Sequence, residues 1–303
     1  MTSWSRFPLS PYAAGVAHAV RSSLKVSSPA RTVIRRVEAL PPVTSAPLTL
    51  LWAGPPTCRG RAWSARPVPA CSVGGMGEHS VVDVGDVRLA YRTWGDSYGA
   101  PVVLLHGLGA SAASWEEAGQ VLGEEWRVYA IDLRGHGESD WPDEYAVELM
   151  RDDVLGFLDE LELDRVGLVG HGMGGVVARL LAQEQADRVE RLVLEDAPPP
   201  FPGGAVVRDV RPDEPLDYDW PVVPAITRQL ADPDPDWLDG LGEIVAPTLI
   251  ITGGPDSPVS RDRMPDMAAL IPDCRTIAIP AGRSVHEEQP RAFAQEVTEF
   301  LTS

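Results

Sequence analysis

The chain has very little lysine and cysteine, and it has no long apolar run. Its 303 residues include one lysine (Lys25) and three cysteines (Cys58, Cys71 and Cys274), an odd number without the spacing of a metal-ligand set. Free thiols are typical of a reducing compartment, so we expect a cytoplasmic protein without a cysteine-held metal ion. No apolar stretch approaches the roughly 18 residues that a membrane-spanning helix needs.

Positive charge is scarce as well, and it is unevenly distributed. The formal net charge is −18. Residues 1–75 carry nine Lys/Arg against one Glu, a net charge of +8, whereas residues 76–303 carry 17 Arg against 43 Asp/Glu, a net charge of −26. An acidic body of that size repels nucleic acids and anionic membranes. We therefore exclude both as partners and expect a small molecule instead; the sequence does not indicate an oligomeric state.

Residues 1–75 differ in composition from the rest of the chain. They contain ten prolines, ten serines and scattered arginines, with no sustained helical or strand period. Such a composition predicts disorder, and its Arg-rich, Ser-rich, acid-poor character is also typical of an organelle transit peptide. The interpretation we favour is that translation starts at Met76, where a regularly patterned sequence begins, so that residues 1–75 are a spurious extension.

From Met76 onward the sequence predicts an α/β domain. Strands are expected at 81–84, 87–94, 101–105, 127–131, 165–169, 191–194, 248–252 and 275–279, and helices at 115–122, 144–161, 173–185, 261–270 and 289–301. This alternation predicts a doubly wound, mostly parallel sheet with helices on both faces, filling residues 76–303. The alternation of strands and helices is interrupted at residues 198–242 by Pro- and Asp-rich sequence. We expect these residues to form a short lid over the carboxyl ends of the strands.

Five motifs follow one another along this domain. They are HGLGAS (106–111), DLRGHGES (132–139), GHGMGG (170–175), GGPDS (253–257) and VHEEQPRAF (285–293). In this order they resemble the α/β-hydrolase family over about residues 80–302. The GHGMGG motif lies between a predicted strand and a predicted helix, as the G-x-S-x-G nucleophile elbow of serine hydrolases does. The resemblance implies a hydrolase with a Ser-His-Asp triad gathered around this turn.

The position of the nucleophilic serine is occupied by Gly172, which carries no attacking atom. Glycine freely adopts the positive φ of an elbow, whereas serine is strained there and is kept for its reactivity. In the family, the oxyanion is held by backbone N–H groups after the His-Gly motif and after the nucleophile, positions that match Leu108 and Met173. Because backbone donors do not depend on the side chain, we expect this oxyanion hole to persist.

The acid and the base of the triad are the other two expected site residues. The resemblance places the acid at Asp256 in GGPDS, where the alternative role is a turn or helix cap. Family members carry the base in a Gly-His pair after the last strand, but here that pair is Gly282-Arg283, and a guanidinium stays protonated. The nearest imidazole is His286, which is either a displaced base or a second, non-catalytic histidine. We favour loss of the base, with both alternatives open.

Three functions remain open, and whether the protein is an enzyme is one of the questions. The first is weak or non-standard hydrolysis of a small ester, lactone or related carbonyl compound by an impaired triad, with His286 or Asp256 activating water. The second is a non-catalytic protein that binds a small molecule in the same pocket.

The third function is dinucleotide binding. With glycine at its centre, GHGMGG also matches the fingerprint G-x-G-x-x-G, and Glu195 follows twenty residues later, where a ribose-binding acid is expected. In dinucleotide-binding domains, however, this turn follows the first strand, whereas here several strands precede it. Apart from this hypothesis the sequence indicates no cofactor and no metal.

Overall fold

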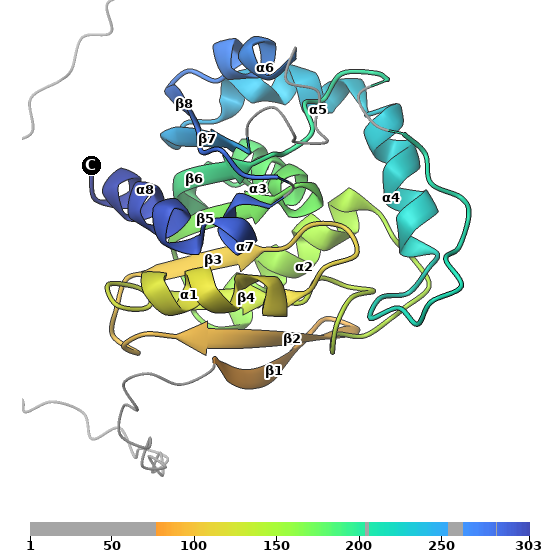
Figure 1. Ribbon diagram of the computed structural model, residues 1–303, viewed down its shortest axis with the longest axis horizontal. Coiled ribbons are helices and arrows are strands. Elements are labelled where there is room, and N and C mark those ends of the chain that lie inside the picture. The colour runs from red at the N-terminus through yellow and green to blue at the C-terminus, as the bar shows by residue number, and fades with distance from the viewer. Residues whose placement is uncertain (1–76, 204–205, 254–262, 283) are drawn as a thin grey trace, which may run out of the picture. The chain divides into compact units, whose positions relative to one another are not determined.

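The computed structural model describes residues 77–303 except 204–205, 254–262 and 283 (Figure 1). The predicted N-terminal extension therefore lies outside the described residues, and its disorder or spurious origin stays a prediction.

One eight-stranded sheet forms the centre of the domain. Its strands are β1 (Glu78–Val84), β2 (Val87–Trp94), β3 (Pro101–Leu105), β4 (Arg127–Ile131), β5 (Val166–His171), β6 (Val189–Glu195), β7 (Thr248–Thr252) and β8 (Cys274–Ala278), in the spatial order β1-β2-β4-β3-β5-β6-β7-β8. β1 and β2 form an antiparallel hairpin, β2 pairs antiparallel with β4, and the remaining neighbours are parallel. The predicted, mostly parallel sheet is confirmed, and the ends of each predicted strand shift by at most three residues.

Helices cover both faces of the sheet. They are α1 (Glu116–Leu122), α2 (Val147–Glu160), α3 (Met173–Glu184), α4 (Val222–Ala231), α5 (Pro235–Asp239), α6 (Met264–Leu270), α7 (Val285–Glu288) and α8 (Pro290–Thr302), with short 3-10 helices at Ala112–Trp115, Ala186–Arg188 and Gly240–Glu243. α1 and α8 pack on one face and α2 and α3 on the other (Figure 1). Within the described part of the chain, no helix is both long and apolar enough to cross a bilayer.

Apolar side chains at helical spacing pack the helices against the two faces of the sheet. On α2, Met150, Val154 and Phe157 are fully buried against one face, and on α8 Phe293 and Val297 are fully buried against the other. Burying one large apolar side chain contributes about 1.5–3 kcal/mol to folding. The central strands carry apolar residues toward both faces, which explains why their sequences are continuous apolar runs rather than alternating ones.

Two glycines bring α3 into direct contact with the sheet. A Cβ on Gly170 would lie 2.3 Å from the carbonyl oxygen of Gly174, and a Cβ on Gly174 would lie 2.4 Å from the carbonyl oxygen of Leu105. Any larger residue at either position would push α3 away from β3 and β5. The glycine-rich motif thus holds the start of α3 at the middle of the carboxyl edge of the sheet.

The chain between β6 and β7 forms a cap segment, which we define as residues 198–242 apart from 204–205. It contains α4 and α5, and the buried residues Val222 and Ile226 anchor α4 to the core. An isolated β-bridge between His136 and Tyr218 connects the cap segment to the loop after β4. These are the residues that the sequence predicts to form a short lid over the carboxyl ends of the strands, and that role stays a prediction.

Candidate active site

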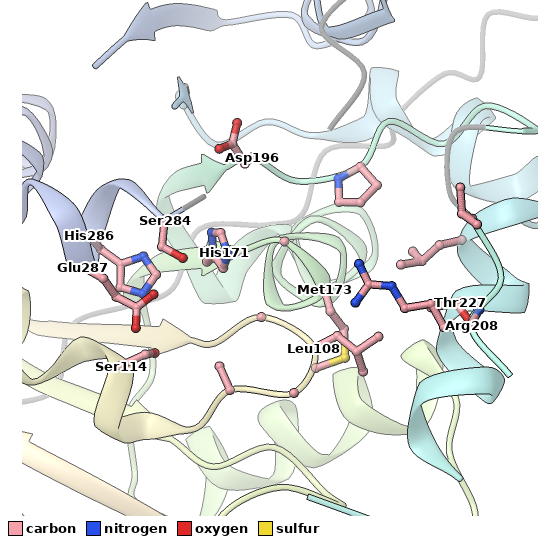
Figure 2. A pocket seen from close by; sticks show the side chains of 17 residues that line it. Leu108, Ser114, His171, Met173, Asp196, Arg208, Thr227, Ser284, His286 and Glu287 are labelled. Carbon is pink, nitrogen blue, oxygen red and sulfur yellow. The ribbon is translucent and has the colours of Figure 1, made fainter. Parts of the chain in front are cut away.

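A cavity of about 580 Å³ lies at the carboxyl ends of the central parallel strands (Figure 2). The loops after β3 and β5 line one part of it, the cap segment another, and α7 a third. Its lining includes Leu108, His171, Gly172, Met173, Arg208 and His286. Ligands of α/β proteins bind at this edge of the sheet, so the cavity is the candidate active site.

Gly172 forms the tip of the turn between β5 and α3. Its φ is 53° and its ψ is −114°, a conformation that side-chain-bearing residues rarely adopt. Its N–H donates to the carbonyl oxygen of Glu195 at 2.9 Å, which ties the turn to the end of β6. Among the described residues other than its two chain neighbours, a Cβ at this position would have one atom within 4 Å, the Cα of Gly107 at 3.8 Å. The space that a side chain would occupy is therefore free, and it borders the cavity.

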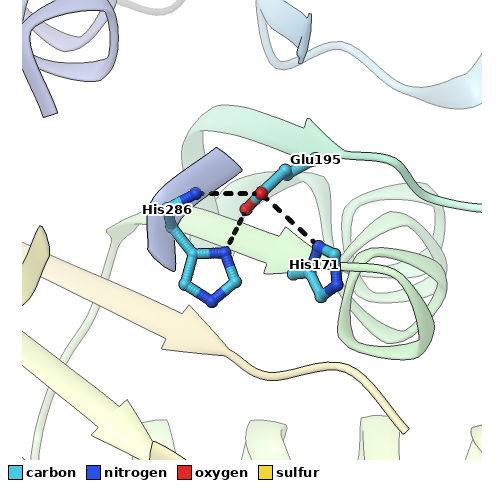
Figure 3. A group of neighbouring side chains, drawn as sticks. All are labelled: His171, Glu195 and His286. Atoms are coloured by element: carbon cyan, nitrogen blue, oxygen red, sulfur yellow. Dashed lines mark hydrogen bonds and ion pairs between the residues drawn. The ribbon is translucent and has the colours of Figure 1, made fainter. Parts of the chain in front are cut away.

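Glu195, the last residue of β6, holds His286 at the start of α7 (Figure 3). Its Oε2 accepts a hydrogen bond from His286 Nδ1 at 2.7 Å. Its Oε1 accepts the backbone N–H groups of Val285 at 2.5 Å and of His286 at 3.1 Å. Three donors thus fix one carboxylate, and the carboxylate in turn fixes both the position and the orientation of the imidazole.

Aromatic rings shield this pair from water. The ring of Trp115 stacks on His286 with centroids 3.8 Å apart and an interplanar angle of 25°, and Phe293 approaches the same imidazole with its centroid at 6.0 Å. The exposed fraction is 1% for His286 and 0% for Glu195. In such a poorly solvated setting, charge interactions and hydrogen bonds are stronger than at the surface.

The proton between Glu195 and His286 belongs to the histidine. Burial alone would raise the pKa of Glu195, but the charge interactions with His286 and His171 and the hydrogen bonds from His286 outweigh it and lower the pKa to about 2. An ionised carboxylate can only accept hydrogen bonds, so Nδ1 of His286 carries the proton. In the neutral form of this ring the other nitrogen, Nε2, is an acceptor. It is buried and has no hydrogen-bond partner among the described residues.

His171, the residue before the tip of the turn, places a second imidazole at Glu195. Its Nδ1 lies 3.6 Å from Glu195 Oε1, and its ring centroid lies 5.0 Å from that of His286. In the part of the chain that the structure describes, these three side chains form the one group whose ligand atoms, all within 4.8 Å of one another, could hold a metal ion. The fit is poor, because a cation would displace the proton on His286 Nδ1 and compete with two backbone N–H groups for the carboxylate. The geometry favours a proton bound to His286 Nδ1 over a metal ion at this group.

Two backbone N–H groups border the cavity at the expected oxyanion positions. Leu108 follows β3, Met173 opens α3, and both line the cavity. Neither amide donates a hydrogen bond to an acceptor in the described ranges. The N–H groups at a helix N-terminus favour negative charge, so these donors are suited to a developing oxyanion.

Two other buried imidazoles build the loops around these donors. His136 Nε2 accepts the N–H of Gly109 at 3.2 Å, and His106 Nε2 accepts the N–H of Leu133 at 3.0 Å. Each Nδ1 faces a backbone carbonyl oxygen, so each ring is neutral with its proton on Nδ1. Burial is the main reason that the pKa of His106 falls to about 4 and that of His136 to about 3. Both rings therefore stay neutral and have a structural role.

The likeness to known proteins agrees with this geometry. The family model described as alpha/beta hydrolase fold matches residues 100–219. A protein of Bacillus subtilis (strain 168), named "Putative 2-succinyl-6-hydroxy-2,4-cyclohexadiene-1-carboxylate synthase", is 30% identical over an alignment of 275 residues that covers 75% of this chain and 100% of that protein. The chain belongs to the α/β-hydrolase family.

Two further proteins place this α/β-hydrolase among relatives with different names. The sn-1-specific diacylglycerol lipase ABHD11 of Mus musculus is 28% identical over 284 residues, covering 78% of this chain and 92% of the mouse protein. The crystal structure of the enol-lactonase from Burkholderia xenovorans LB400 superposes with a TM-score of 0.61 at 24% identity, covering 74% of this chain and 100% of that one. The latter likeness shows the shared fold.

The structure brings four of the six residues expected from the sequence into one cavity. Gly172, Leu108, Met173 and His286 all line it. Asp256 and Arg283 lie outside the described residues, so the acid role of the first and the replacement of the base by the second stay predictions.

Glu195 is the site residue of this α/β-hydrolase that sequence reasoning missed, because it was considered only as a ribose-binding acid. Its side chain is fully buried and holds His286, which gives the dinucleotide hypothesis no support. One signal could have found it. A carboxylate at the last residue of the strand beside the elbow strand must lie at the carboxyl edge of the sheet, where the site is.

Proposed function

We propose that this α/β-hydrolase adds water to a small ester, lactone or related carbonyl compound, with His286 as the general base and Glu195 as the acid that orients it. The observation that carries the proposal is the Nε2 atom of His286, which is buried and lacks a hydrogen-bond partner among the described residues, on a side chain that lines the cavity together with Gly172. A base oriented by a carboxylate through one ring nitrogen, with the other available, is the arrangement that proton abstraction needs. The geometry favours a displaced base over the lost base that the sequence suggested.

In the proposed reaction, a water molecule occupies the free space beside Gly172. His286 Nε2 takes a proton from this water as its oxygen attacks the carbonyl carbon, and the N–H groups of Leu108 and Met173 stabilise the resulting oxyanion. When the tetrahedral intermediate collapses, the bond to the leaving oxygen breaks and His286 returns its proton to that oxygen. The products are a carboxylic acid and an alcohol, and no covalent bond to the protein forms.

The absence of a nucleophile sets the expected rate. A triad without its nucleophile retains roughly 10³–10⁴-fold acceleration over water, supplied by the oxyanion hole and by binding. Activated esters and strained lactones are therefore the expected substrates, because their intrinsic barriers are low. The names of two related proteins, a diacylglycerol lipase and an enol-lactonase, support the choice of esters and lactones as the substrate class.

A second candidate function is non-catalytic binding of a small molecule. The observation that favours it is Gly172 itself, since the turn retains its unusual backbone conformation while the side chain that would justify the strain is missing. In that case the cavity binds its ligand without converting it.

The test is steady-state hydrolysis of 4-nitrophenyl acetate and dihydrocoumarin by the full chain and its variants. We expect slow turnover by the wild type without a pre-steady-state burst, because no acyl-enzyme forms. The variants His286→Gln and Glu195→Gln are expected to lower kcat/KM by about 100-fold or more, since general-base catalysis contributes typically 10²–10⁴-fold.

The matched control is His79→Gln, because His79 is an exposed histidine on β1 that does not line the cavity. It should leave kcat/KM unchanged. A wild-type rate that survives His286→Gln refutes the assignment of the base. No turnover of either substrate by the wild type refutes the proposed function and favours the binding protein.

A further inference from the structure

Arg208 introduces a positive charge into the cavity of a strongly acidic domain. Of the described residues that line the cavity, it is the only Lys or Arg. Its guanidinium points from the cap segment toward Met173 at the base of the cavity (Figure 2). No salt bridge to Arg208 occurs in the described ranges. A cation without a partner, facing a ligand cavity, is available to a ligand.

The backbone at Arg208 is anchored to α4. Its N–H donates to Thr227 Oγ1 at 3.1 Å, and this hydroxyl donates in turn to the carbonyl oxygen of Val223 at 2.8 Å. Thr227 is buried, with an exposed fraction of 5%. A few residues earlier, the N–H of Gly203 donates to the carbonyl oxygen of Ala231 at 2.8 Å. These bonds hold the start of the Arg208 side chain at one wall of the cavity.

The carboxylates of the cavity lie away from Arg208. Glu287, exposed on α7, lies beside His286, on the opposite side of the cavity from Arg208 (Figure 2). The other lining carboxylate, Asp196, is buried and accepts the N–H of Gly253. Among the described lining residues, positive charge therefore lies at the wall formed by the cap segment, and the exposed negative charge lies beside His286. This distribution favours the orientation that places an anionic end of a ligand at Arg208.

We propose that Arg208 forms an anion subsite, and that the natural ligand carries a carboxylate several bonds from its reacting carbonyl group. The guanidinium matches a carboxylate through two parallel hydrogen bonds, and the reacting carbonyl then lies toward Leu108, Met173 and His286. The inference deepens the proposed function and rests on it for the identity of the reacting group. It is tested by binding without turnover, so that the two can fail separately.

The experiment compares 5-oxohexanoate with its uncharged isostere 5-oxohexanamide, two ketones that cannot be hydrolysed at the carbonyl. Dissociation constants for the full chain are measured by ligand-observed NMR titration at low ionic strength. We expect the wild type to prefer the oxo acid about tenfold, as one charge-assisted contact at an exposed guanidinium supplies. Arg208→Gln should remove this preference, and Arg208→Lys should retain part of it.

Two control variants separate the subsite from other effects. Arg211→Gln removes an exposed arginine of the same stretch that does not line the cavity, and it should keep the full preference. His286→Gln should also keep the preference for the oxo acid, even though this variant loses hydrolytic activity. The proposal is overturned if the wild type binds both ketones equally, if its binding of 5-oxohexanoate is too weak to measure, or if the preference for 5-oxohexanoate persists in Arg208→Gln. A wild type that hydrolyses neither ester nor lactone but keeps the preference refutes only the proposed reaction.

Discussion

Replacing Gly172 by serine tests the geometry of the elbow and the base together. Apart from its chain neighbours, the Cβ of the new side chain meets one atom of the described residues within 4 Å, the Cα of Gly107 at 3.8 Å, which is an ordinary contact. The cost of the substitution is therefore in the backbone and not in packing. A residue with a side chain at φ 53° is strained by about 1–3 kcal/mol.

This strain converts into a measurable loss of thermal stability. For domains of 150–250 residues, 1 kcal/mol shifts Tm by about 2–4 °C, so Gly172→Ser is expected to lower Tm by about 2–12 °C. Gly172→Ala is the matched control, because it introduces the same backbone strain without a hydroxyl. Differential scanning calorimetry should give similar losses for the two variants.

The two variants should differ in chemistry. Under the proposed function, Nε2 of His286 accepts the proton of the new hydroxyl in Gly172→Ser, so 4-nitrophenyl acetate should release a burst of nitrophenol close to one equivalent and leave an acetyl group on the protein. Stopped-flow absorbance and intact-protein mass spectrometry detect these two products. Gly172→Ala should show neither.

Two results would refute the reasoning. If Gly172→Ser is correctly folded but never acylated, His286 does not face position 172, and the proposed base is misassigned. If Gly172→Ser and Gly172→Ala unfold at the wild-type Tm, the turn is not strained, and Gly172 is not there to relieve it.

Three other substitutions or conditions have definite expected outcomes. The buried rings of His106 and His136 have pKa values of about 4 and about 3, so in the folded protein they stay neutral at pH values where the unfolded chain binds protons. The free energy of unfolding should therefore decrease as the pH falls from 6.5 toward 4, by about 3 kcal/mol for His106 alone. Urea unfolding at pH 7, 5.5 and 4.5 measures this free energy, and a value that does not change with pH contradicts the prediction. Arg179 is 1% exposed, its three side-chain nitrogens have no hydrogen-bond partner in the described ranges, and burial lowers its pKa to about 9. Arg179→Met should therefore raise the free energy of unfolding by about 1–3 kcal/mol. A lower free energy of unfolding for the variant would show that the guanidinium has a partner in solution. Arg134→Met leaves the buried carboxylate of Asp153 without its 2.5 Å ion pair and should cost about 3–5 kcal/mol, whereas Arg88→Met, which removes an exposed pair, should cost less than about 1 kcal/mol in the same calorimetric assay.

Much of the fold could be predicted because strand and helix periods are local properties of the sequence. The apolar run of β3 and the helical spacing on α2 required no knowledge of their neighbours, and their predicted positions agree with the structure to within a few residues. The glycines of the elbow were equally informative, because the positive φ at Gly172 admits few alternatives. Ends of elements were less certain, since capping and tertiary contacts decide them.

The acid–base pair could not be predicted in the same way. Glu195 and His286 are separated by 91 positions in sequence, and nothing local to either indicates that Oε2 of one meets Nδ1 of the other at 2.7 Å. The family resemblance directed attention to the Gly-His position of the last loop, where this chain has Arg283. It did not suggest that a carboxylate at the end of β6 holds His286. The pairing follows from the order of β5 and β6 in the sheet, which is a non-local property.

Glu195 serves as one anchor for two parts of the site. Its carbonyl oxygen holds the N–H of Gly172, and its carboxylate holds His286, so a shift of the end of β6 moves the turn and the base together. The cap segment, which carries Arg208, shares none of these bonds. Substitutions in the cap segment can therefore change the cavity wall around Arg208 without removing any of the bonds by which Glu195 fixes Gly172 and His286.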